Sequence, residues 1–305
     1  MVSLSDIKKF FRGTILLDES LSKYTWMRVG GAADYYVEPA DRSDLVEIVK
    51  YFQQNGFPFL ILGRGSNVLV SDEGIRGAVI NLESALSSLR MGGDCVIAEA
   101  GVWIQKFVDF CIQHDLAGVE MLAGVPGTIG GAVVMNAGSH GGEISDHLVE
   151  VEILRNCEIM RIPKKDAGFS YRHSAFDNDV VLSASFQLPK GDREELAKRR
   201  RELILKRNET QPLELPNSGS MFKNPPNTFA ARLIEQAGLK GKRIGNAQIS
   251  EKHANFIVNL GAAKATEIIQ LLELARRTVY QNSGIQLELE VKLYGFQQKM
   301  IGQVS

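Results

Sequence analysis

One stretch of 22 residues, from Met121 to Gly142, carries no charged side chain and limits the folds open to this chain. Its length and lack of charge would suit a membrane-spanning helix. The stretch also contains Pro126, Asn136 and seven glycines, and residues of these kinds break or weaken helices. We therefore expect a glycine-rich loop system inside a soluble protein.

The composition is that of a globular protein with a sizeable core. Of 305 residues, 44% are hydrophobic and 23% are charged. Lysine and arginine together number 35 against 36 aspartates and glutamates, which gives a net charge of −1. We therefore expect no nucleic-acid partner and no membrane partner, and no obligate protein partner is evident.

The cysteines and the first residues indicate a cytoplasmic protein without a metal site. Cys95, Cys111 and Cys157 show no C-x-x-C spacing, and an odd number of cysteines is typical of a reducing compartment. Residues 1–20 contain no apolar core of an export signal. No H-E-x-x-H or similar metal-ligand spacing occurs.

Hydrophobic periodicity predicts an α+β architecture in three parts, residues 1–82, 83–208 and 209–305. The first two parts read as strand and helix modules, the first of them a β-α-β unit. The second part ends in a charged connector helix over 192–209, whose basic run at 198–201 we interpret as a solvated face. The third part reads as a smaller domain of βαβ type.

Two glycine-containing loops follow predicted strands and could bring backbone N–H groups close to an anion. Ser66, Asn67 and Thr128 add side-chain donors. Paired loops favour a ligand with two phosphates, such as a dinucleotide, although a tight turn in each loop is the alternative. Neither loop matches G-x-G-x-x-G or G-x-x-x-x-G-K-[ST], so a nicotinamide-type Rossmann domain and a P-loop are disfavoured.

Polar residues gather in three further segments. Tyr171 and Arg172 precede an apolar strand, where a turn with a salt bridge is the alternative to a functional role. A small-residue turn over 218–225 carries a hydroxyl, an ammonium and an amide group, with a capped turn as its alternative. A strand over 285–294, which alternates strictly, places Glu288, Glu290 and Lys292 on one face, and that face could simply be solvated.

Together these motifs resemble the family of UDP-N-acetylenolpyruvoylglucosamine reductases, in the family's order over nearly the whole chain. The matching stretches are 24–25, 30–34, 62–67, 124–132, 136–138, 171–172, 219–225 and 287–291. The resemblance implies an FAD-binding module of two subdomains, of the vanillyl-alcohol-oxidase type, in residues 1–82 and 83–208. It also implies a C-terminal α+β domain for a UDP-sugar in residues 209–305.

The resemblance further implies a flavin-dependent oxidoreductase of peptidoglycan precursor synthesis. Such an enzyme uses NADPH to reduce the enolpyruvyl group of UDP-N-acetylglucosamine-enolpyruvate to UDP-N-acetylmuramate. No histidine lies between Gly63 and Val70, so we expect non-covalent FAD. No room exists between Val181 and Gln211 for the tyrosine-bearing loop of longer members, so the chain looks like the shorter subgroup.

Site residues carry over position by position from the resemblance. Arg172, Ser220 and Glu290 would be catalytic: Arg172 would bind the enolpyruvyl carboxylate, Glu290 would polarise it, and Ser220 would donate a proton. Tyr171, Arg172, Lys223 and Asn224 would contact the substrate. The residues expected to bind FAD are Gly63, Arg64, Gly65, Ser66, Asn67, Gly127, Thr128, Gly130 and Gly131. An oxygen-dependent flavin oxidase and a non-enzymatic nucleotide-sugar binder are the alternatives.

Overall fold

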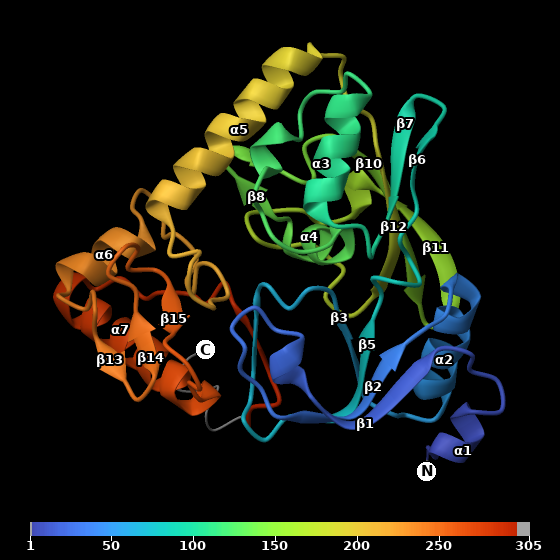
Figure 1. Ribbon diagram of the computed structural model, residues 1–305, viewed down its shortest axis with the longest axis horizontal. Coiled ribbons are helices and arrows are strands. Elements are labelled where there is room, and N and C mark those ends of the chain that lie inside the picture. Colours follow the sequence, from blue (N-terminus) through green and yellow to red (C-terminus); the bar gives the residue numbers. More distant parts are fainter. Residues whose placement is uncertain (1, 298–305) are drawn as a thin grey trace. The chain divides into compact units, whose positions relative to one another are not determined.

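The computed structural model describes residues 2–297, which divide into two compact units. The first unit comprises Met1–Leu17, Tyr35–Gly63 and Gly77–Lys206. The second comprises Asp18–Asp34, Arg64–Arg76 and Arg207–Ser305. Figure 1 labels the helices and strands of both units.

A four-stranded sheet of order β1-β2-β5-β3 starts the fold. Its strands are β1 (Thr14–Ser20), β2 (Ala32–Glu38), β5 (Ile75–Asn81) and β3 (Phe59–Leu62), and β3 runs parallel to β5. The helix of the predicted β-α-β unit is α2 (Arg42–Gln54), which buries Leu45, Ile48, Val49 and Phe52. Because β5 lies between β2 and β3, the predicted β-α-β unit lacks direct pairing of its two strands.

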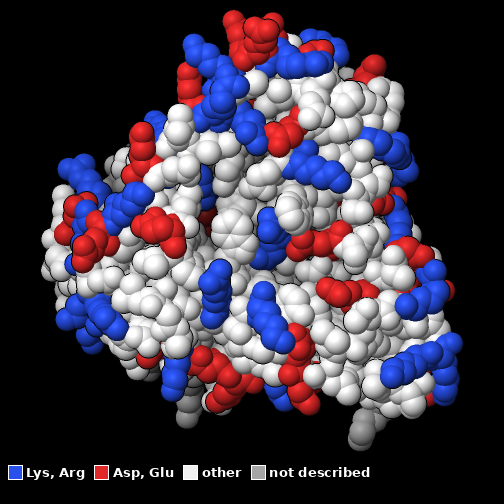
Figure 2. Space-filling model, viewed as in Figure 1, with Lys and Arg blue, Asp and Glu red and all other residues white. Residues whose placement is uncertain are grey.

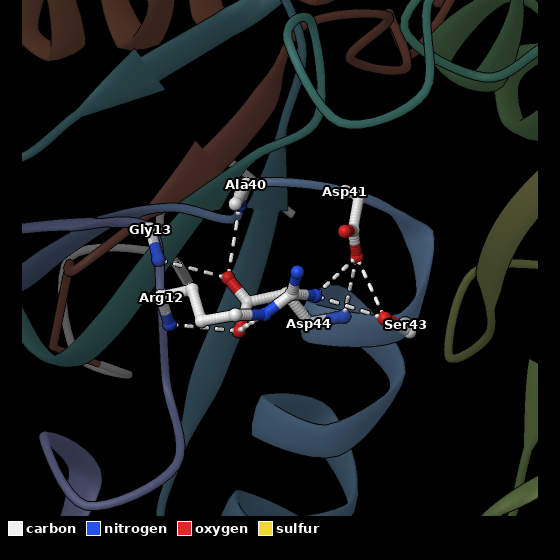
Figure 3. Close-up of polar contacts among 6 residues, drawn as sticks. All are labelled: Arg12, Gly13, Ala40, Asp41, Ser43 and Asp44. Carbon is white, nitrogen blue, oxygen red and sulfur yellow. Dashed lines mark hydrogen bonds and ion pairs between the residues drawn. The ribbon is translucent and has the colours of Figure 1, made fainter.

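The start of α2 is fixed by two aspartates (Figure 3). Asp41 is the N-cap, and its carboxylate accepts from the N–H of Asp44. That N–H and the neighbouring hydroxyl and guanidinium donors hold the pKa of Asp41 well below its usual range. The buried Asp44 carboxylate accepts from the N–H groups of Arg12, Gly13 and Ala40 at 2.9–3.0 Å. Asp44 therefore joins the chain entering β1 to the helix.

The largest sheet belongs to the first unit and has the order β11-β10-β12-β7-β6, with every pairing antiparallel. Its strands are β6 (Leu89–Gly92), β7 (Cys95–Glu99), β10 (Leu148–Arg155), β11 (Glu158–Pro163) and β12 (Val180–Phe186). Helices α3 (Ile104–Gln113) and α4 (Ile129–Met135) pack against it (Figure 1). Phe107 of α3 meets Phe186 of β12 with ring centroids 4.7 Å apart.

Helix α5 (Arg193–Thr210) confirms the charged helix expected over 192–209. Its basic residues form ion pairs instead of facing only solvent. Arg193 binds Asp115 at 2.9 Å, and Arg199 binds Glu120 at 3.1 Å. Arg200 binds Asp109 at 2.6 Å. On the face drawn in Figure 2, positive and negative side chains are interspersed.

The second unit contains an antiparallel sheet of order β13-β14-β15 with helices α6 and α7. These elements are β13 (Arg243–Ile244), β14 (Ala247–Ile249), β15 (Ile257–Asn259), α6 (Ala230–Gln236) and α7 (Ala265–Ser283). The predicted βαβ type was therefore wrong. Strands β13 and β14 are too short to give an apolar alternation, so the sequence pattern missed them and the turn that reverses the chain.

The strand predicted over 285–294 was also wrong in extent, because only β16 (Lys292–Tyr294) forms within it. Strand β16 pairs in parallel with β4 (Val68–Val70). Residues 287–291 instead meet the 221–223 segment at a single antiparallel bridge, Phe222–Leu289. Leu287 and Val291 are buried, as the alternating pattern predicts, although the segment does not form the continuous backbone pairing of a β-strand.

The remaining elements are short. They are α1 (Leu4–Ile7), η1 (Leu21–Lys23), η2 (Glu120–Leu122), η3 (Lys164–Asp166), β8 (Gly138–Ser139) and β9 (Gly142–Glu143). Within residues 2–297, no helix has the length and apolar character needed to span a membrane. The same residues contain no group of three or more His, Cys, Asp or Glu side chains placed to hold a metal ion.

Candidate active site

The two predicted glycine loops meet within the first unit, at Gly63 and Thr128. A Cβ built on Gly63 would lie 2.6 Å from the Thr128 hydroxyl oxygen, so only glycine fits while Thr128 is present. Thr128 is 3% exposed and immediately precedes α4. The two motifs are therefore neighbours, as expected for loops that serve one ligand.

The second loop uses its glycines in different ways. The N–H groups of Ile129 and Gly130 donate to the carbonyls of Val102 and Ala100 at 2.8 Å, so they serve the fold. A Cβ on Gly130 would lie 2.9 Å from the Ala100 methyl group, which explains that glycine by packing.

Gly131 has no such explanation within the chain. A Cβ there would have Thr128 Oγ1 at 3.8 Å as its one close neighbour. The residue sits inside a helix, where glycine is about 1 kcal/mol less favourable than alanine. A ligand lying close to the backbone accounts for glycine at this position. The loop residues therefore fit a large phosphate-bearing cofactor such as FAD.

The first loop continues into the second unit, where it packs on the segment 24–26. Gly65 has φ +61°, and a Cβ there would clash with the Tyr24 carbonyl oxygen. The Gly65 carbonyl accepts from the N–H of Trp26 at 3.0 Å. The Arg64 guanidinium lies over the Trp26 ring, 5.8 Å from its centroid. Ser66 is half-buried in the same loop.

Asn67 joins this loop to the segment that carries Glu290. Its side-chain amide donates to the Glu290 carbonyl at 3.1 Å, and its own carbonyl accepts from the Lys292 N–H at 3.0 Å. The two bonds flank Val291, which is buried. Asn67 thus holds the backbone of the proposed catalytic segment.

Ser220 and Glu290 lie on two paired segments of the second unit. Met221, the residue after Ser220, accepts from the Glu290 N–H at 2.9 Å. Asn255 fixes the same segment because its carbonyl accepts from the Met221 N–H at 2.8 Å. The Asn255 side chain is 3% exposed and binds both the N–H and the carbonyl of Phe222. The structure therefore brings these two predicted catalytic residues together.

The two other polar residues of this turn have partners within the unit. The Lys223 ammonium lies 3.8 Å from the Glu288 carboxylate, whose side chain is largely exposed. The Asn224 side-chain oxygen accepts from the Ala230 N–H at 3.1 Å, at the start of α6. That bond gives Asn224 a structural role at the start of the helix.

Arg172 belongs to the first unit, and its guanidinium is largely buried, with the side chain 16% exposed. Its Nη2 donates to the Gly138 carbonyl at 2.7 Å, and its Nη1 donates to the Asn136 carbonyl at 3.4 Å. The guanidinium also lies over the Tyr171 ring, 5.0 Å from its centroid. Several fixed contacts thus orient one planar cation, the group best suited to a carboxylate.

Sequence reasoning missed the residues that hold these groups in place. Asn67 was assigned only to the cofactor, and Asn136 and Asn255 were not assigned at all. Asn136 stood within a matching stretch, at 136–138, which was the one available signal. Asn255 acts through contacts with Phe222, 33 positions away, for which local spacing gives no sign.

Comparisons with known proteins give matches over most of the chain. The C-terminal domain model of UDP-N-acetylenolpyruvoylglucosamine reductase matches residues 211–294, and an FAD-binding domain model matches residues 33–158. A reductase of that name from Chloroherpeton thalassium is 46% identical over 97% of this chain and 98% of its own length. Another, from Caldanaerobacter subterraneus subsp. tengcongensis, is 41% identical over 93% of this chain and 94% of its own length.

A solved structure shows the same similarity in three dimensions. The crystal structure of UDP-N-acetylenolpyruvylglucosamine reductase from Thermus caldophilus superposes with a TM-score of 0.79 at 34% sequence identity. It covers 93% of this chain and all of its own. The expected FAD-binding module with a C-terminal substrate domain, an α+β fold, is confirmed. The chain belongs to the UDP-N-acetylenolpyruvoylglucosamine reductase family.

Proposed function

We propose that this protein reduces the enolpyruvyl group of UDP-N-acetylglucosamine-enolpyruvate to UDP-N-acetylmuramate, for peptidoglycan precursor synthesis. NADPH is the co-substrate and FAD is bound without a covalent link. The observation that carries the proposal is the pairing of the Ser220 and Glu290 segments through Met221. It puts a hydroxyl and a carboxylate on neighbouring segments, which the chemistry requires.

The two glycine loops would hold the cofactor. The residues that we propose for this role are Gly63, Arg64, Gly65, Ser66, Asn67, Gly127, Thr128, Gly130 and Gly131. When bound, FAD would supply the hydride-transfer chemistry between NADPH and a carbon–carbon double bond. The chain's own residues must bind the substrate, orient it and supply the proton that completes the reduction.

Arg172 binds the enolpyruvyl carboxylate. The double bond is conjugated to that carboxylate, so addition of hydride at the β-carbon places negative charge on the α-carbon and the carboxyl oxygens. A preorganised guanidinium stabilises this charge without rearranging. Its contacts with two backbone carbonyls support this role because they fix its plane before substrate arrives. The Tyr171 ring lies against one face of the Arg172 guanidinium.

Ser220 donates the proton to the α-carbon through its hydroxyl hydrogen. A serine hydroxyl is a weak acid, so the step needs a strongly basic carbon and a positioned donor. Glu290 polarises the substrate carboxylate and must carry or share a proton to avoid repelling it. Lys223 and Asn224 contact the nucleotide sugar. The boundaries at 82/83 and 208/209 remain our proposal for how these functions divide along the chain.

We place the reaction in the cytoplasm. The three cysteines, Cys95, Cys111 and Cys157, are all free in the structure, and free thiols suit a reducing compartment. We propose no nucleic-acid or membrane partner, since the net charge is −1, and we propose no obligate protein partner.

Substrate-dependent oxidation of NADPH tests the proposal. Purified full-length protein with FAD should consume NADPH only when the enolpyruvyl nucleotide sugar is added, and should form UDP-N-acetylmuramate in equal amount. Oxygen-dependent consumption without the sugar would instead support the oxidase alternative. Binding of the sugar without NADPH consumption would support the non-enzymatic binder.

A further inference from the structure

The hairpin of β8 and β9 brings a carboxylate beside Arg172. Gly138 pairs with Glu143 across the hairpin, and the Gly138 carbonyl is the acceptor for Arg172 Nη2. A Cβ on Gly138 would lie 2.9 Å from Glu143 Cγ and 3.1 Å from Arg172 Nη1. The glycine thus allows the carboxylate and the guanidinium to approach each other.

Asn136 fixes the Glu143 carboxylate. Its amide nitrogen donates to Glu143 Oε2 at 2.7 Å and to the Ser170 carbonyl at 2.9 Å. Because both partners are acceptors, they determine which end of the amide carries nitrogen. Ser170 is two residues before Arg172, so one amide connects the carboxylate to the turn that holds the guanidinium.

Asn136 is buried at the end of α4, where one of its polar atoms lacks a partner. It has φ +44°, the left-handed C-cap conformation that asparagine adopts more readily than most residues. It is 1% exposed, and its Oδ1 has no hydrogen-bond partner among the described residues. A buried unsatisfied oxygen destabilises the fold, and a functional role is one explanation for such a group. Arg172 has φ +54°, a left-handed backbone that is uncommon for arginine.

The spacing between Glu143 and Arg172 suits orientation rather than neutralisation. Their closest atoms, Oε1 and Nη1, are 4.0 Å apart, which is beyond hydrogen-bond distance. By contrast, Arg155 and Asp179 of the same unit form two hydrogen bonds at 2.6 and 2.8 Å. A bidentate partner of that kind would compete with a substrate carboxylate. Glu143 attracts the guanidinium without taking up its donors.

We propose that Glu143, fixed by Asn136, is a positioning residue that holds the Arg172 guanidinium for the substrate carboxylate. The inference rests on the proposed function of Arg172. In this proposal Glu143 acts only by holding Arg172 and does not contact the reacting atoms.

The test compares Glu143→Gln with Glu150→Gln in the full-length, FAD-loaded protein. Glutamine keeps an oxygen for Asn136 to bind and removes only the charge. Glu150 is a matched control because its carboxylate lies 3.8 Å from Arg161 in the same unit and is 36% exposed, against 33% for Glu143. Flavin content and melting temperature establish that each variant is folded, and Glu143→Asp, which retains the charge, provides a second variant.

We expect Glu143→Gln to raise KM for the enolpyruvyl sugar about 5- to 30-fold, with flavin reduction by NADPH unchanged. Glu150→Gln should leave both unchanged, and Glu143→Asp should recover part of the loss. In an Arg172→Ala background, adding Glu143→Gln should have no further effect. An unchanged KM in Glu143→Gln, or full additivity with Arg172→Ala, would overturn the proposal.

A readout independent of turnover separates this inference from the proposed function. The Arg172 side-chain NMR signal, assigned by its loss in Arg172→Lys, should shift or broaden in Glu143→Gln and stay unchanged in Glu150→Gln. An unchanged signal in Glu143→Gln would refute the positioning role whatever the activity. A changed signal in a protein that never reduces the sugar would refute the proposed function and leave the positioning contact standing.

Discussion

The side-chain amide of Asn67 donates a hydrogen bond to the backbone carbonyl of Glu290, at 3.1 Å. The two residues are 223 positions apart in the sequence. Asn67 therefore fixes the segment that carries a proposed catalytic carboxylate. Asn67 and Glu290 belong to the same compact unit.

Replacing Asn67 with Asp tests that connection. Aspartate has nearly the same shape but no donor, and its charge would repel the Glu290 carbonyl. We expect a loss of about 1–2 kcal/mol in the free energy of unfolding, as for a half-buried hydrogen bond with an unsatisfied acceptor. Denaturant unfolding measures it. Equal stability of Asn67→Asp and the unaltered protein would show that the bond contributes nothing.

Removing the Ser220 hydroxyl separates the two halves of the catalytic cycle. Ser220→Ala should leave flavin reduction by NADPH unchanged and slow reoxidation by the enolpyruvyl sugar at least ~10²-fold, the size of a general-acid contribution. Anaerobic stopped-flow absorbance follows each half separately.

Ser218→Ala is the control for that experiment. The Ser218 hydroxyl lies in the same turn but donates to the Val68 carbonyl at 3.0 Å, which is a structural contact. This variant should lose stability and keep its reoxidation rate. Unchanged reoxidation in Ser220→Ala would remove Ser220 from the role of proton donor.

Gly131→Ala should have opposite effects on the apoprotein and on cofactor binding. Alanine favours the helix by up to about 1 kcal/mol, and apart from its chain neighbours and the adjacent helix backbone the nearest atom to the new methyl group is Thr128 Oγ1, at 3.8 Å. The melting temperature without FAD should therefore stay equal or rise, while FAD affinity falls. Titration of apoprotein with FAD measures the affinity. Unaltered affinity would show that the cofactor does not approach this glycine.

His253 gives the stability of the second unit a dependence on pH. Burial lowers the pKa of His253 below its usual 6.5, an effect that nearby Lys240 increases and a backbone hydrogen bond partly opposes. A depressed pKa means that the unfolded chain binds the proton more readily. The contribution of neutral, buried His253 to the free energy of unfolding is therefore complete above pH 6.5. It is lost as the pH falls below that value, through the lower pKa of the folded state.

A His253→Gln variant checks the sign of this effect. The difference in unfolding free energy between the two proteins should be constant above about pH 7 and should shrink as the pH falls toward 5. Denaturant unfolding at several pH values provides the curve. A difference that does not change with pH would contradict the assignment.

Part of this fold could be predicted from local pattern. Helix α7 follows from apolar spacing and from Gly284, whose φ of +69° ends it. The strand predicted over 285–294 was too long. Alternation of apolar and polar residues indicates which side chains are buried, but a β-strand also needs a neighbouring strand for its backbone hydrogen bonds. Among the described residues, β4 pairs with three residues of this segment, and Phe222 forms a single bridge with Leu289.

The residues proposed to be catalytic could be predicted, but the residues that hold them in place could not. Motif resemblance supplied Arg172, Ser220 and Glu290, whereas pattern alone left each with a structural alternative. The close approach of Gly63 to Thr128 depends on tertiary packing that no local spacing encodes. Asn136 ends α4 in a left-handed backbone, which asparagine tolerates, but its hydrogen bonds to Glu143 and Ser170 depend on tertiary packing.

An anaerobic single-turnover measurement tests the central claim most directly. The FAD-loaded protein is bleached with one equivalent of NADPH, and the enolpyruvyl nucleotide sugar is then added in the absence of oxygen. The account predicts that the oxidised flavin spectrum returns with formation of one equivalent of UDP-N-acetylmuramate, and that Arg172→Ala bleaches normally but recovers far more slowly. A flavin that stays bleached until air is admitted would contradict it.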